Sequence, residues 1–115
     1  MPPDDNKATA AAKHDGDIVT LAGKLDVSDV EKLRPQFEHI DQGTGWVIVD
    51  VTDVSFMDSS VLGILVQART VATGAGRSVC LVGASRNVLR LFSVTNLDTV
   101  FPMFDTLGDV PEFTG

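Results

Sequence analysis

Asp58, Ser59 and Ser60 are adjacent acidic and hydroxyl side chains placed between two apolar runs. The run before them is typical of a buried strand and the run after them of a helix, so we expect all three at a helix N-terminus. Free backbone N–H groups at such a terminus favour a nearby negative charge. A serine hydroxyl there can cap the helix, receive a phosphoryl group, or act as a nucleophile beside a base.

A hydrolase built on Ser59 would need a general base, and the sequence offers no convincing one. The two histidines, His14 and His39, lie far apart in charged contexts, and Ser59 is outside any G-x-S-x-G elbow. We therefore expect a binding protein and no enzyme. Neither histidine stands at a metal-ligand spacing from cysteine or carboxylate, so no metal or other cofactor is expected.

Length and composition favour one ordinary globular domain. The chain has 115 residues and a formal net charge of −7, which argues against a nucleic-acid partner or an anionic membrane surface. The single cysteine, Cys80, sits in an apolar run and predicts a buried thiol in a reducing compartment. No leader and no apolar run of about 18 residues is found, so a cytoplasmic location is expected.

The elements that position the serines alternate between strands and helices. Strands are expected at 18–22, 46–51 and 79–82, with an edge strand at 100–104 that Pro102 interrupts. Helical patterns follow the first three strands. This order predicts an α/β domain over 16–115, with a mixed, mostly parallel sheet of four to five strands and helical crossovers. Residues 1–15 are expected to form a flexible tail or a weak edge strand.

The first helical pattern begins at Ser28, which has the S-x-x-E spacing of a capping box with Glu31. Pro35 lies inside this pattern and should kink the helix or delay its start. The second pattern, after Ser60, has more apolar residues than one sheet face requires, beginning with Val61 and Ile64. This surplus indicates either deeper burial or a surface for a partner.

Strand-to-helix turns of a parallel sheet gather at one end, where function concentrates. We therefore expect Asp26 and Asp58 to flank Ser59 there, with the turn at 83–85 as a further candidate. Gly74 should end the second helix, and Asn96 should end the third in a left-handed cap. Arg86 and Arg90 are expected to form a solvated face of that third helix.

Three segments of the chain resemble those of a known family. The stretch L-A-G-K-L-D at 21–26 resembles the L-x-G-x-L-D signature of STAS domains, and F-M-D-S-S-V-L-G-I-L at 56–65 resembles their F-M-D-S-S/T-G-L-G motif. The stretch R-L-F-S-V-T-N-L at 90–97 fits as well. The resemblance covers about residues 16–104, and its nearest subgroup is the bacterial anti-sigma factor antagonists.

The resemblance implies a single STAS-like domain and a partner switch of bacterial transcription and stress response. Ser59 would be the phosphoacceptor, with Ser60 as a lesser alternative. The unphosphorylated chain would bind an anti-sigma factor serine kinase and release the sigma factor, and a phosphatase would reverse the phosphorylation. The partner-binding residues implied by this reasoning are Asp26, Asp58, Ser59, Ser60, Val61 and Ile64.

Two residues depart from the family pattern, namely Val61 and Asn96, where glycine is usual. Val61 places partner identity in question, whereas Asn96 is compatible with the same cap. A monomer is expected. The alternative function is a non-switching STAS scaffold or ligand-sensing module of a larger assembly or transport system.

Overall fold

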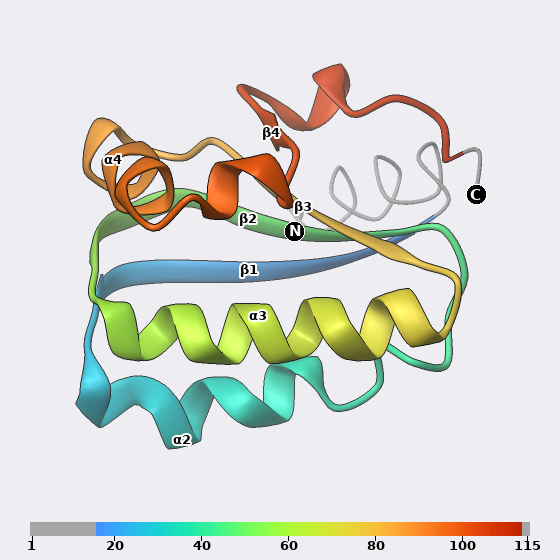
Figure 1. Ribbon diagram of the computed structural model, residues 1–115, viewed down its shortest axis with the longest axis horizontal. Coiled ribbons are helices and arrows are strands. Elements are labelled where there is room, and N and C mark those ends of the chain that lie inside the picture. Colours follow the sequence, from blue (N-terminus) through green and yellow to red (C-terminus); the bar gives the residue numbers. More distant parts are fainter. Residues whose placement is uncertain (1–15, 114–115) are drawn as a thin grey trace, which may run out of the picture.

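Four parallel strands form one sheet in the order β1-β2-β3-β4 in the computed structural model (Figure 1). The structure describes residues 16–113, so the tail or edge strand predicted for 1–15, and His14, lie outside the described residues. The strands are β1 (Gly16–Leu25), β2 (Trp46–Met57), β3 (Ser78–Val82) and β4 (Met103–Phe104). The predicted α/β domain with a largely parallel sheet is confirmed.

Helical segments cover both faces of this sheet. Those on one face are η1 (Val27–Asp29), α2 (Val30–Leu33), η2 (Arg34–Phe37) and α3 (Ser59–Gly74). The helix α4 (Arg86–Val94) and η3 (Leu97–Thr99) place Val88, Phe92 and Leu97 in the same buried cluster as α3, whereas Leu107 of η4 (Leu107–Asp109) packs with the cluster on the opposite face. No helix in the described part of the chain is long and apolar enough to cross a membrane.

The central strand β2 is buried on both faces, as its continuous hydrophobicity predicts. Its alternate side chains enter two separate clusters of buried residues. Val47 and Val49 pack in the larger cluster with residues of α3, and Ile48 packs on the opposite side with Cys80. Burial raises the pKa of the Cys80 thiol to about 12, so the thiol stays protonated and behaves as a small apolar side chain.

The first helical pattern forms a short composite and differs from the prediction at its start. Asp26, and not Ser28, is the capping residue: its side chain accepts from the Ser28 N–H at 2.9 Å, and Asp29 bonds back to the Asp26 N–H at 2.9 Å. The α-helical turn ends at Leu33, and a 3-10 turn carrying Pro35 follows. Proline lacks the N–H that would continue the α-helical ladder, which explains the change at this point.

Strand β2 extends well beyond its neighbour β3. Pairing with β3 ends at Asp50 and Val82, whereas pairing with β1 continues to Met57. Gly83 then leaves the sheet with φ +76 and passes so close to Thr52 that a side chain there would collide with it. The helix α4 packs beside this free part of β2, where the Asn87 amide donates to the Ser55 carbonyl at 3.5 Å, three residues before Asp58.

A buried arginine, Arg77, orders the loop that leads into β2. The guanidinium pairs with Asp17 at 2.9 Å. It also donates hydrogen bonds of 2.7–3.2 Å to four carbonyl oxygens, those of Ile40, Thr44, Gly45 and Trp46. Each of the three guanidinium nitrogens therefore has at least one partner, which is what makes burial of this charge acceptable.

The C-terminal segment pairs with the sheet over a shorter length than predicted, because only Met103–Phe104 forms strand β4. Pro102 precedes it and has no N–H to donate, although its carbonyl accepts from Leu81. The Trp46 indole donates to the Pro111 carbonyl at 2.8 Å and contacts the Phe113 ring edge to face, with centroids 5.5 Å apart. The segment is therefore anchored across the sheet.

Candidate functional site

The ends of β1 and β2 bring Asp26 and Asp58 to the same end of the sheet. Leu25 pairs with Met57, and the Asp58 N–H donates to the Leu25 carbonyl at 3.1 Å. The residue after each strand is therefore an aspartate that starts a helical segment. The structure therefore brings these two acids and Ser59 to one end of the sheet, as expected; in Figure 1, β1 and β2 end at the left, where α3 begins.

Asp58 caps α3 by itself. Its backbone is extended, with φ −97 and ψ 174, and its Oδ1 accepts from the Ser60 N–H at 2.9 Å. Ser59 and Ser60 are the first two residues inside the helix and neither caps it. The prediction that the two serines cap the helix is therefore wrong, because the Asp58 carboxylate caps it.

The Ser59 side chain is exposed, and among the described residues its hydroxyl makes no hydrogen bond. It stands on the first turn of α3, where backbone N–H groups without helical partners create a partial positive charge. A hydroxyl that is accessible, uncommitted and near this charge can accept a phosphoryl group. The Ser60 side chain is also exposed, but its backbone N–H is held by Asp58.

Asp26 is bonded within its own turn. The Ser28 hydroxyl donates to its Oδ1 at 2.6 Å, and this bond is the main cause that lowers the pKa of the Asp26 carboxyl. Within the described part of the chain no hydrogen bond joins Asp26 to Ser59. Asp26 therefore shapes the surface beside the serine without orienting its hydroxyl directly.

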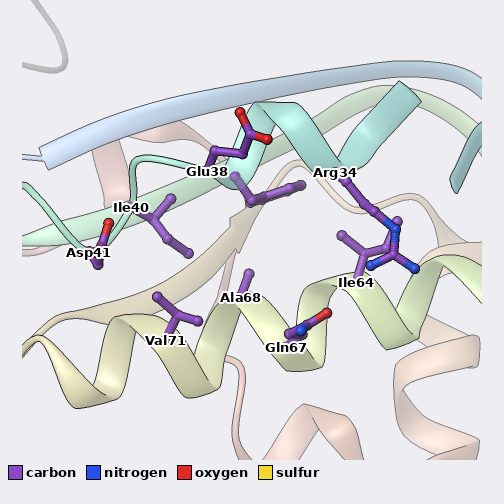
Figure 2. A pocket seen from close by; sticks show the side chains of 9 residues that line it. Arg34, Glu38, Ile40, Asp41, Ile64, Gln67, Ala68 and Val71 are labelled. Carbon is purple, nitrogen blue, oxygen red and sulfur yellow. The ribbon is translucent and has the colours of Figure 1, made fainter. Parts of the chain in front are cut away.

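Val61 and Ile64 belong to the core in this structure. Val61 is 0% exposed and Ile64 is 6% exposed, so the surplus of apolar residues reflects deeper burial. A partner cannot touch Val61 in this conformation, and its predicted place on a partner-contacting face is corrected. Ile64 lines a groove of about 260 Å³ between α3 and the α2–η2 segment, together with Phe37 and Ala68 (Figure 2).

Among the described residues, no histidine lies near Ser59 to serve as a catalytic base. His39 is exposed and follows η2, before the start of β2, whereas Ser59 follows the end of that strand. The twelve residues of the extended strand β2 separate the two ends, whereas a general base must lie within hydrogen-bond reach of the hydroxyl. Among residues 16–113 no three histidine, cysteine or acidic side chains cluster as a metal site requires.

Comparisons with known proteins connect this chain to one family. Residues 8–110 match the family model described as the STAS domain. An anti-sigma-B factor antagonist from Bacillus subtilis is 30% identical over 89 residues, which cover 76% of this chain and 82% of the relative.

Solved structures share the fold. The anti-sigma factor antagonist SpoIIAA in its unphosphorylated form has a TM-score of 0.65 at 26% identity, covering 78% of this chain and 80% of that chain. Its phosphorylated form, from Bacillus, has a TM-score of 0.60 at 24% identity over 78% and 83% of the chains. The STAS domain of a SulP transporter from Vibrio cholerae has a TM-score of 0.69 over 92% and 91%, at 15% identity.

Proposed function

The chain belongs to the STAS domain family, and from this premise we propose that it is an anti-sigma factor antagonist switched by phosphorylation of Ser59. The unphosphorylated chain binds an anti-sigma factor serine kinase in the cytoplasm and so frees the sigma factor. Phosphorylation ends the binding, and a phosphatase restores it. The observation that carries the proposal is the exposed Ser59 hydroxyl, which is left uncommitted because Asp58 caps α3.

The charge of the phosphate accounts for the switch. A phosphoserine adds about −1.5 to −2 charges at pH 7. The N-terminus of α3 tolerates this charge in the free chain because unpaired N–H groups surround it. A partner packed on the same surface would have to desolvate the dianion. A penalty of about 3 kcal/mol weakens binding roughly a hundredfold, without any refolding of the domain.

Ser59 is favoured over Ser60 by the position of the cap. The Asp58 carboxylate bonds to the Ser60 N–H, so a phosphate on Ser60 would stand beside the carboxylate that stabilises the helix start. The Ser59 N–H does not bond to that carboxylate, so a phosphate on Ser59 leaves the helix cap undisturbed. The relative SpoIIAA, solved in unphosphorylated and phosphorylated forms, also supports a switch of this kind.

The test uses the purified chain, ATP and the anti-sigma factor kinase of the same host. Mass spectrometry should find one phosphate on Ser59, absent from Ser59→Ala and retained by the matched control Ser60→Ala. Calorimetry should show tight binding of the unphosphorylated chain and binding about a hundredfold weaker after phosphorylation. Phosphate found elsewhere, or an affinity that phosphorylation leaves unchanged, would refute the switch.

A non-switching module is the second candidate, because the SulP transporter STAS domain shares the fold over most of both chains. A STAS scaffold, a ligand sensor or a transport module would need no kinase. Size exclusion of host extract separates these functions. A small complex that contains the kinase supports the switch, and a very large particle whose assembly ignores Ser59→Asp supports the scaffold.

A further inference from the structure

A groove lies between the end of β2 and the helix α4, and we call it the α4 groove. It measures about 320 Å³ and is lined by Phe56, Met57, Asn87, Arg90, Leu91 and Val94. It begins only three residues before Ser59, because Phe56 and Ser59 belong to the same strand-to-helix junction. A partner that covers Ser59 therefore approaches the mouth of this groove.

Apolar side chains in the α4 groove are unusually exposed. Val94 is 72% exposed and Phe56 is 41% exposed, although both are large apolar residues. The Lys24 ammonium lies 5.8 Å from the centroid of the Phe56 ring, which leaves an apolar surface beside a cation. Exposed apolar surface with a polar rim is typical of an interaction site.

The charge around the α4 groove is opposite to that of the chain as a whole. Arg90 is its one charged lining residue, and α4 has two arginines and no acid in a chain of net charge −7. Among the described residues, Arg90 forms no ion pair, since the two pairs there belong to Arg34 and Arg77. The groove therefore suits a carboxylate next to an apolar side chain.

We propose that the α4 groove is a second docking surface for the anti-sigma factor, and that it binds a short segment with an apolar and an acidic side chain. The inference rests on the proposed function and adds a contact that phosphorylation does not alter. The apolar side chain packs on Phe56 and Val94, and its acidic neighbour pairs with Arg90. A second copy of this chain is a poorer occupant, because two chains of net charge −7 repel each other.

Charge reversal on α4 tests the ionic contact. Arg90→Glu is compared with Arg86→Glu, which changes the same charge on the same helix but lies outside the groove lining. Calorimetry with the purified anti-sigma factor kinase of the host should show binding at least about tenfold weaker for Arg90→Glu and within about twofold for Arg86→Glu. Equal effects of the two variants would overturn the proposal.

A second pair of variants tests the apolar contact at exposed positions that do not build the core. Val94→Ser should weaken binding about threefold to tenfold, whereas Leu89→Ser, equally on α4 but outside the groove lining, should not. Thermal unfolding confirms that each variant is folded. One outcome is that the wild type binds the kinase and Ser59→Asp weakens that binding, while Arg90→Glu and Val94→Ser bind as well as Arg86→Glu and Leu89→Ser. In that case only the docking role of the α4 groove is refuted. If the wild type does not bind, the proposed function fails. A dimer in sedimentation that Arg90→Glu dissociates would assign the groove to a second copy and overturn the proposal.

Discussion

Replacement of Asp58 by alanine should destabilise the domain, whereas replacement of Ser59 should not. The Asp58 carboxylate holds the Ser60 N–H at 2.9 Å, and loss of an N-cap side chain costs about 1 kcal/mol. The negative charge at the N-terminus of the 16-residue α3 adds about 0.5 kcal/mol. We expect Asp58→Ala to lower the free energy of unfolding by about 1.5 kcal/mol in total.

Three companion variants separate the two contributions. Asp58→Asn keeps an oxygen acceptor and loses only the charge, so it should cost about 0.5 kcal/mol. Ser59→Ala and Ser60→Ala remove exposed hydroxyls that do not cap the helix, and each should change the free energy of unfolding by less than about 0.5 kcal/mol. Urea denaturation followed by circular dichroism measures all four variants with a common slope.

The reverse order of effects would refute this reasoning. If Ser59→Ala cost more than about 1 kcal/mol and Asp58→Ala cost nothing, Ser59 would be the helix cap and its hydroxyl would be committed to the fold. The Ser59 hydroxyl would then not be free to accept a phosphoryl group from a kinase. With the expected order, Ser59→Ala serves as a fully folded, unphosphorylatable chain for the binding experiments.

Three further predictions concern the remaining buried or bonded groups. Arg77→Met should lower the free energy of unfolding by about 3–5 kcal/mol, because four backbone carbonyls lose their hydrogen-bond donor. Asp17→Asn changes a carboxylate that is 58% exposed and should lower the free energy of unfolding by less than about 1 kcal/mol. Equal losses for the two variants in urea titrations would contradict this expectation. NMR titration should give the Asp26 carboxyl a pKa below 3.8, and the Ser28→Ala variant should raise that pKa. The contribution of Asp26 to stability is present above pH 3.8 and disappears as the pH falls through the lowered native pKa. A pKa that Ser28→Ala leaves unchanged would exclude the Ser28 hydrogen bond as the cause. The Cys80 thiol, with a pKa of about 12, should react with a disulfide reagent only as fast as the domain unfolds, and rapid labelling of the native chain would show that the thiol is accessible.

The sequence predicted the parts of the fold that follow from local patterns. The continuous apolar run at 46–51 identified a strand buried on both faces, and Asn96 does adopt the left-handed conformation, with φ 63, that its position suggested. The meeting of Asp26 and Asp58 also followed, because parallel neighbours end at the same edge. These features depend only on the spacing of apolar residues, on the residue types that turns prefer, and on the topology of parallel strands.

Other features depend on tertiary structure and could not be obtained from spacing. Both Asp26 and Ser28 are good N-cap residues, and only the position of the strand end decides that Asp26 takes the role. An apolar surplus at Val61 fits a core or an interface equally well until the packing is known. The buried position of Arg77 could not be predicted from the sequence, because its carbonyl partners lie more than thirty residues earlier in the chain.

Trp46 has a consequence for how this domain can be connected to other molecules. Gly16 pairs with Trp46 at the start of the sheet, and the indole of the same residue holds the Pro111 carbonyl. Both ends of the described chain therefore meet one tryptophan, at the end of the sheet remote from Ser59. A tag, a surface linker or a fused protein joined directly to Gly16 or Phe113 would leave from that remote side. The domain is thus suited to immobilisation by either end of its described part, with Ser59 facing the solution.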